Sequence, residues 1–366
     1  MAKTLVMVGT RKGAFFLWSD EARREWRVEG PILKGWEVQD LTLDARRGRP
    51  ELFAAVGHFV YGATVQRSTD FGQTWIQIEK GPEYPDGSDG SGSKLKRIWC
   101  IEPGHPSEPD VLWAGVDEAG LFVSEDGGDS WREVSALRGH PTHEGWMPGL
   151  GGLCCHTVCI DPGDPRRMWL GISAVGVFRT EDRGQSWRVC NEGLPIVSPA
   201  KDFRDIGSCI HRIAVSPDEP GVLYQQNHRG VFRSRDGADS WQRIENGLPA
   251  TFGFPIALDP NRSHTLYVLP QESDEYRFFP EGHLAVYRSQ DGGDSWQAMT
   301  RGFPRGPAYT GVLRNAMDVD GRDALGIYFG TTGGNVFYSR DGGDTWDQMP
   351  CLLPRVASIT AVVLED

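Results

Sequence analysis

The chain has 366 residues, of which 38 are Lys or Arg and 50 are Asp or Glu, so its formal net charge is −12. This acidity disfavours nucleic acid and anionic membranes as partners. The sequence has no apolar run long enough to span a membrane, begins with a strand-like segment rather than a signal peptide, and spaces its seven cysteines without pairing, so we expect a cytoplasmic protein with free thiols.

An eight-residue motif recurs six times along the chain. It reads Ser/Thr-x-Asp-x-Gly-x-Ser/Thr-Trp, with Ala238 replacing the glycine in one copy, and it occupies residues 68–75, 124–131, 180–187, 234–241, 289–296 and 339–346. A degenerate copy precedes them, with Ser19-Asp20 as its start and Trp26 following a short insert. A fixed period of this size is typical of propellers and other repeat architectures.

The motif is the Asp-box, or BNR repeat, and the chain resembles the Asp-box β-propellers. These include sialidases, xyloglucanases, sortilin-type receptors and photosystem II assembly factors. Asp and Ser side chains of such a motif can bond nearby backbone N–H groups and close a turn, and glycine supplies the positive φ. A catalytic or calcium-binding role for the six aspartates is the alternative.

The resemblance does not extend to a true sialidase, because the chain lacks the Arg-Ile-Pro segment of that family. Xyloglucanases of the family have two seven-bladed rings with the active cleft between them. A single ring lacks that cleft unless it dimerises.

The strand pattern predicts a single all-β domain over residues 1–366. The first repeat supplies strands at 4–9, 14–18 and 25–29, and a later repeat shows the full set at 209–215, 222–226, 230–234 and 241–245. The C-terminal run 356–364 has no partners after it, so we expect it to complete the first blade and remove an open edge. The result is a seven-bladed β-propeller of four-stranded antiparallel blades.

The connections between strands differ in length on the two faces of this propeller. The turns after the first strand of each blade are short, whereas the long connections lie at 81–94, 137–153, 191–208, 271–283 and 302–312. Long insertions mark the functional face of a repeat protein, so we expect the site opposite the motif turns.

Aligning the first strands of the blades predicts a ring of polar and aromatic residues around the central channel. These are Gln39, Arg97, His156, His211, Phe254, Asn315 and Thr360, with Lys96 and Arg314 one position earlier. A hydrated channel filled by hydrogen-bonded polar side chains is the structural alternative to a binding pocket.

The first functional interpretation is a hydrolase or lyase, glycosidase-like, that acts on a small polar or carbohydrate-like ligand. His156 and His211 would transfer protons, with Glu144 or Asp205 as the carboxylate partner. Arg97 and Arg314 would bind an anionic group. Trp146 and Phe254 would stack on a ring, and the remaining polar contacts would come from Gln39, Asn315 and Lys96.

Two other interpretations stay open. A divalent metal such as Zn or Fe could be held by His156, His211 and either His143 or His228, although no compact ligand spacing supports this. A non-catalytic binding or assembly protein would instead use an apolar patch to bind a protein partner, for which Trp146, Phe278 and Phe279 are the candidates.

Overall fold

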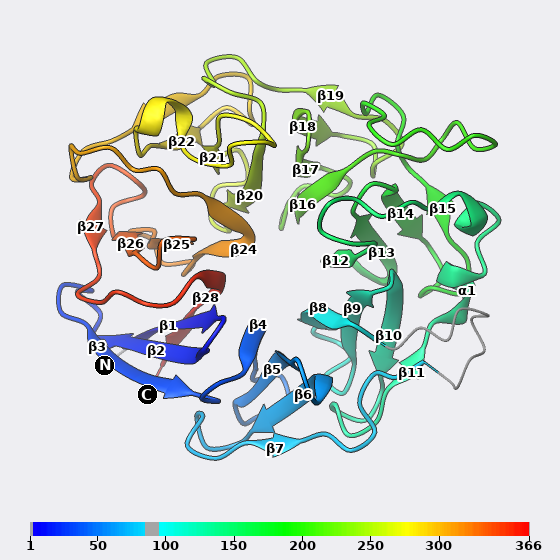
Figure 1. Ribbon diagram of the computed structural model, residues 1–366, viewed down its shortest axis with the longest axis horizontal. Helices are drawn as coiled ribbons and strands as arrows, with labels where there is room; N and C mark the ends of the chain where they lie inside the picture. The colour runs from blue at the N-terminus through cyan, green and yellow to red at the C-terminus, as the bar shows by residue number, and fades with distance from the viewer. Residues whose placement is uncertain (1–2, 85–94, 366) are drawn as a thin grey trace. The chain divides into compact units, whose positions relative to one another are not determined.

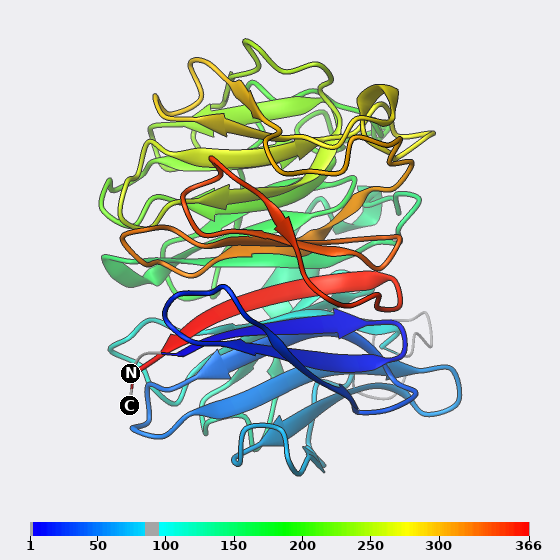
Figure 2. The same cartoon turned by 90° about the vertical axis from the view of Figure 1, so that its left-hand side faces the viewer.

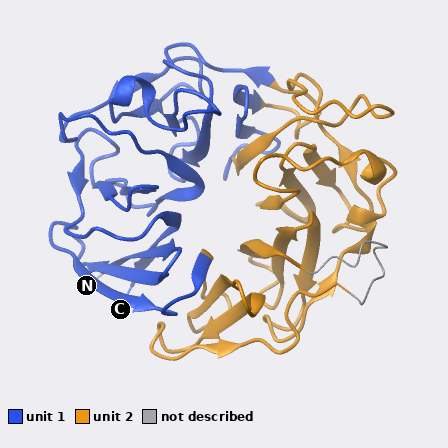
Figure 3. Cartoon of the chain, viewed as in Figure 1, with its two compact units in different colours: residues 1–38, 216–233, 242–366 blue, residues 39–215, 234–241 orange. Residues whose placement is uncertain are grey.

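The computed structural model describes residues 3–84 and 95–365, which are almost entirely β-strand and turn (Figure 1). Most of the predicted connection 81–94 therefore lies outside the described residues. The chain divides into two compact units, unit 1 with residues 1–38, 216–233 and 242–366, and unit 2 with residues 39–215 and 234–241 (Figure 3). No helix among the described residues is long and apolar enough to cross a membrane.

Unit 2 consists mainly of four-stranded antiparallel sheets whose strands follow one another in the chain. Their strands are β4 (Glu37–Asp44), β5 (Glu51–His58), β6 (Gly62–Ser68) and β7 (Ile76–Gln77); β8 (Arg97–Pro103), β9 (Leu112–Asp117), β10 (Gly120–Ser124) and β11 (Arg132–Glu133); and β12 (Cys155–Asp161), β13 (Asp164–Ile172), β14 (Gly176–Thr180) and β15 (Arg188–Val189). The unit also holds α1 (Ser135–Arg138), the 3-10 turn η1 (His143–Gly145) and β16 (Ile210–Val215).

Unit 1 contains an eight-stranded sheet in the order β27-β26-β25-β24-β28-β1-β2-β3. Its strands are β1 (Lys3–Thr10), β2 (Gly13–Ser19), β3 (Arg27–Ile32), β24 (Val312–Val319), β25 (Ile327–Thr331), β26 (Val336–Ser339), β27 (Asp347–Gln348) and β28 (Val356–Leu364). The other elements are β17 (Leu223–Asn227), β18 (Gly230–Ser234), β19 (Gln242–Arg243), β20 (Gly253–Leu258), β21 (Leu266–Pro270), η2 (Pro280–Gly282), β22 (Val286–Ser289) and β23 (Gln297–Met299).

The C-terminal strand β28 has the bounds predicted from the sequence and lies beside β1. The two strands pair antiparallel from Lys3 opposite Leu364 to Thr10 opposite Val356 (Figure 2). On its other side β28 meets β24 through a single parallel bridge between Asn315 and Ser358, and this bridge joins two four-stranded groups into one sheet. The repeated four-stranded antiparallel sheets agree with a β-propeller. The number of seven blades stays a prediction.

Each full copy of the motif closes the turn between the third and fourth strands of its sheet. In the first full copy Asp70 accepts hydrogen bonds from the Thr74 backbone N–H (2.9 Å), the Thr74 hydroxyl (2.6 Å) and the Ser68 hydroxyl (2.8 Å). These bonds, the Thr74 hydroxyl first, lower the pKa of Asp70 to about 2. The same set recurs around Asp126, Asp182, Asp236, Asp291 and Asp341, which confirms the predicted turn-closing role.

The degenerate first copy keeps the eight-residue spacing, from Ser19 to Trp26. The expectation of a short insert before Trp26 is therefore wrong. Ser19 ends β2 as the motif Ser or Thr ends its strand in every full copy, and Trp26 directly precedes β3. Glu21 therefore stands at the position of the motif aspartate and Glu25 at that of the second Ser or Thr. Two ionised carboxylates cannot hydrogen bond to each other, so this turn cannot form the usual network.

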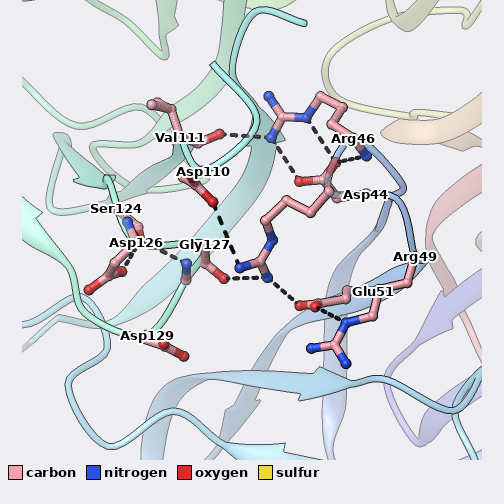
Figure 4. A network of polar contacts seen from close by, with 12 residues as sticks. Asp44, Arg46, Arg49, Glu51, Asp110, Val111, Ser124, Asp126, Gly127 and Asp129 are labelled. Atoms are coloured by element: carbon pink, nitrogen blue, oxygen red, sulfur yellow. Dashed lines mark hydrogen bonds and ion pairs between the residues drawn. The ribbon is translucent and has the colours of Figure 1, made fainter. Parts of the chain in front are cut away.

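Two arginines in the connection between β4 and β5, Arg46 and Arg47, join two sheets of unit 2. Arg46 donates to both carboxylate oxygens of Asp44 (2.8 and 2.7 Å) and to the Val111 carbonyl (2.8 Å) beside β9 (Figure 4). Arg47 donates to Glu51 (2.6 Å) and to the carbonyl of Gly127 in the motif turn (3.3 Å). These contacts fix the sheet of β4 to β7 against that of β8 to β11.

Removal of residues 356–366 should abolish cooperative folding of unit 1. The deletion exposes β1 and β24 and removes Val356 and Ile359, whose side chains are buried, at a cost of roughly 3–6 kcal/mol in apolar burial alone. Thermal unfolding followed by circular dichroism measures the effect, with removal of Asp366 alone as the control. A truncated protein that melts like the full chain would contradict a structural role for β28.

Candidate functional site

The predicted site residues divide between the two units. Phe254, Arg314 and Asn315 belong to unit 1; Gln39, Lys96, Arg97, His143, Glu144, Trp146, His156, Asp205 and His211 belong to unit 2. We describe the surroundings of each set within its own unit.

The His156 side chain is fully buried on β12. Its Nε2–H donates to the Ile210 carbonyl (2.9 Å), and Nδ1 lies 3.0 Å from the Thr157 hydroxyl. The Trp99 ring contacts the imidazole edge-on, with centroids 6.4 Å apart. Because both ring nitrogens are occupied and the ring has no exposure to solvent, this geometry fits a core side chain better than a proton carrier.

His211 is also buried, and its Nε2 lies 3.7 Å from the Cys209 thiol. Gln39 is buried as well, although the sequence placed it on a ligand-binding ring. Among the described residues, the ligand atoms of His143, His156 and His211 do not gather closely enough to share one ion. His156 uses both ring nitrogens within the core, which fits a metal ligand poorly, and the choice of metal ligands stays a prediction.

Trp146 lies in the hydrophobic core and not on a ligand-binding surface. Its ring packs against Phe178 with centroids 5.2 Å apart, and its Nε1–H donates to the Thr142 hydroxyl (3.0 Å). Phe279 is buried too, so two of the three aromatic residues predicted to form a protein-binding patch are unavailable. The predicted carboxylate partners Glu144, in η1, and Asp205, between β15 and β16, are exposed.

Arg97 and Lys96 meet two carboxylates that the sequence analysis missed. Arg97 is the register partner of Asp117 at the end of β9, and Lys96 forms an ion pair with Glu118. The Lys96 backbone N–H also donates to the Asp117 carbonyl (2.9 Å). An alignment of the first strands does not reach these two residues, because Asp117 ends the second strand of its sheet, β9, and Glu118 follows it.

Asp117 is a desolvated carboxyl group. Its residue is only 7% exposed, and its Oδ1 makes no hydrogen bond to the described residues. Gly152 covers it so closely that a Cβ there would lie 2.8 Å from Oδ2. Burial, followed by the charge of Glu118, raises the pKa of Asp117 to about 6, although Lys96, Arg97 and the Trp99 side chain oppose the shift. A carboxyl group of this kind can hold a proton near neutral pH.

The corresponding turn of the neighbouring sheet, between β5 and β6, exposes a stack of rings. Phe59 is 96% and Tyr61 71% exposed, and both rings lie nearly parallel to the His58 imidazole at centroid distances of 4.6 and 4.9 Å. An exposed stack of this kind offers a flat apolar surface to a ligand.

Unit 1 brings the predicted Arg314 and Phe254 together. The Arg314 guanidinium lies 5.0 Å and that of Arg277 5.7 Å from the centre of the buried Phe254 ring. Nearby, His228 pairs with Asp274 (2.9 Å), and burial lowers the pKa of this histidine. Asn315 is buried at the bridge between β24 and β28, which fits a role in joining the strands.

Comparison with known proteins gives relatives that share part of this chain. No family model matches. The chain is 28% identical over 232 residues to an oligoxyloglucan-reducing end-specific xyloglucanase of Emericella nidulans, covering 54% of this chain and 26% of the relative. It is 25% identical over 270 residues to xyloglucanase Xgh74A of Acetivibrio thermocellus, covering 63% of this chain and 29% of the relative. The chain thus spans only about a quarter of the length of these relatives.

Solved structures show a similar fold at low identity. A GH74 enzyme of Niastella koreensis superposes with a TM-score of 0.64 at 19% identity over 93% of this chain and 51% of that one. YCF48 from Cyanidioschyzon merolae gives a TM-score of 0.55 at 15% identity over 87% of this chain and 86% of that one. These likenesses support the β-propeller class of fold.

Replacing Asp117 with Asn should stabilise the protein in a pH-dependent way. The folded pKa of about 6 lies above the ordinary value of about 3.9, so stability falls as pH rises between these values and stays reduced above them. Asp117→Asn should therefore raise Tm at about pH 8 and change it little near pH 3.5. Glu125→Gln on the same sheet is the control, and an equal shift at both pH values would contradict the raised pKa.

Replacing His156 with Ala should destabilise unit 2. The change leaves a cavity and an unpaired Ile210 carbonyl, at a cost of about 2–4 kcal/mol. Urea unfolding measures the loss, with the exposed His283→Ala as control. Unchanged stability would return His156 to the set of ligand-binding candidates.

Proposed function

We propose that the chain is a glycosidase-like hydrolase that cleaves a glycosidic bond at the turn carrying Asp117 and Glu118. The observation that carries this proposal is the buried Asp117 carboxyl group, which is followed in the chain by the ion-paired carboxylate of Glu118. The pKa of Asp117 is raised to about 6. Two carboxyl groups in different protonation states are what glycoside hydrolysis requires. The xyloglucanase relatives agree with a carbohydrate substrate.

In this proposal Asp117 is the general acid. Its carboxyl O–H donates the proton to the glycosidic oxygen as the bond from C1 to that oxygen breaks. Glu118 accepts a proton from the attacking water, whose oxygen forms the new bond to C1. One water is consumed, and the two carboxyl groups exchange protonation states, so solvent restores them after each cycle.

The neighbouring side chains have supporting roles in this proposal. Lys96 holds the Glu118 carboxylate by an ion pair, and Arg97 is fixed over the Trp99 ring, 4.9 Å from its centre. The exposed rings of Phe59 and Tyr61 would stack on a sugar residue.

Arg314 and Phe254 stay candidate ligand contacts of unit 1. A cytoplasmic location is also proposed, since all seven cysteines are free thiols.

A non-catalytic binding protein is the second candidate. The exposed fractions of Phe59, Val60 and Tyr61, which are 96%, 62% and 71%, favour it because such a tip can also contact a protein. In that case Phe59→Ala would abolish partner binding, and no substrate would be hydrolysed.

Asp117→Asn should lower kcat on xyloglucan oligosaccharides by roughly 10²–10⁴-fold, the contribution typical of general acid catalysis. The wild-type rate should fall as pH rises through about 6, since the proton on Asp117 is lost there. Reducing-sugar release over a pH series measures both effects. Glu125→Gln, an exposed carboxylate after β10, is the matched control. A folded wild-type protein that hydrolyses no glycoside in a broad panel would overturn the proposal.

A further inference from the structure

A second candidate site lies in unit 1 at the degenerate copy of the motif. The structure shows a groove of about 620 Å³ at the turn between β2 and β3, a volume within the range of small-molecule sites. Two indole rings and four charged side chains line it, namely Trp18, Trp26, Lys3, Asp20, Glu25 and Arg27. Asp117 and Glu118 are not part of this set.

The degenerate motif explains why polar groups face this groove. In a full copy the aspartate accepts three hydrogen bonds from its own turn, as Asp70 does. Here the Ser19 hydroxyl donates instead to the Glu25 carbonyl (2.6 Å), and among the described residues the Asp20 carboxylate receives only the Arg23 N–H (3.1 Å). The Glu25 carboxylate makes no hydrogen bond or ion pair with the described residues. Acceptor oxygens are thus left for a ligand.

The turn is nevertheless held rigidly. Arg23 stands at the position of glycine in the full copies, or of Ala238 in one of them, and it takes the same left-handed conformation at φ +52°. Its buried guanidinium donates to Asp320 (2.7 Å) and to the Ala324 carbonyl (2.7 Å), which tie the turn to the strand pair β24–β25. This anchoring replaces the hydrogen bonds that the missing aspartate would have accepted.

Both indole rings are fixed before any ligand binds. The Trp18 Nε1–H donates to Glu29 (2.9 Å), which also pairs with Arg27 (2.7 Å). Trp26 packs edge-on against Tyr328 and Tyr338 at centroid distances of 5.8 and 5.3 Å. Pre-ordered aromatic surfaces reduce the entropy lost on binding.

We propose that this groove binds a neutral saccharide, with the apolar face of a sugar ring on Trp18 or Trp26 and its hydroxyls donating to Asp20 and Glu25. The groove carries two acidic and two basic side chains, so it has no net charge to select a polyanion or a cation. A sugar combines an apolar face with many hydroxyl donors. These features match the indole rings and the carboxylate oxygens that remain available as acceptors. The site is independent of the proposed hydrolysis.

Titration with cellotetraose, maltotetraose and a xyloglucan heptasaccharide tests this site by NMR of the indole N–H groups. At least one saccharide should shift the Trp18 and Trp26 signals, assigned through Trp18→Phe and Trp26→Phe. The signal of Trp131, whose Nε1–H donates to Gly128 inside a full motif copy (3.2 Å), is the internal control. Glu25→Gln should weaken binding by roughly tenfold, the loss expected for a hydrogen bond to a charged group.

The same titration on Asp117→Asn separates the two proposals. Shifts of Trp18 and Trp26 that persist in this variant support the groove whether or not the protein is a hydrolase. The proposal is overturned if none of the three saccharides shifts these signals at millimolar concentration. It is also overturned if Glu25→Gln and Asp20→Asn, both folded, bind like wild type, or if Asp117→Asn abolishes the shifts.

Discussion

The hydrogen bonds accepted by one carboxylate in each motif turn are the interaction on which the sheets depend. Each such aspartate receives an N–H and two hydroxyl groups from residues within four positions, so the turn from the third to the fourth strand is closed by local bonds alone. A carboxylate that accepts three hydrogen bonds from its own turn has most of its acceptor sites engaged in closing that turn. The repeated aspartates are therefore structural, and chemistry has to come from other parts of the strands.

Asp70 and Asp117 show how surroundings determine what one side chain can do. Asp70 is surrounded by donors, and its pKa falls to about 2. Asp117 is buried at the end of β9 with an unbonded oxygen and a neighbouring acid, and its pKa rises to about 6. Hydrogen bonds stabilise the ionised form, whereas desolvation and like charge destabilise it. The first is fit for closing a turn, and the second for holding a proton.

Two histidines predicted to lie in a binding pocket, His156 and His211, are buried. His156 has the residue type of a catalytic base, but its two nitrogens are hydrogen bonded within the core of unit 2.

In the degenerate motif copy, polar groups that a full copy would use internally are available instead. There the loss of the aspartate removes a local network, and Arg23 anchors the turn through Asp320 far along the chain. Carboxylates and indole rings that would have been internal then line a groove.

The sequence by itself determined the repeated turns, the positions of the strands and the C-terminal strand β28, because these depend on contacts between residues close in the chain or on a clear two-residue periodicity. It also proposed Lys96, Arg97, Arg314 and Phe254 as ligand contacts, and that role stays a prediction. Only the tertiary structure decided which polar side chains are buried. Asp117 and Glu118 resemble any acidic turn in the sequence, and Trp146 resembles any loop aromatic. Their roles depend on desolvation by segments such as Gly152 and on rings such as Phe178, and burial of this kind has no local pattern in the chain.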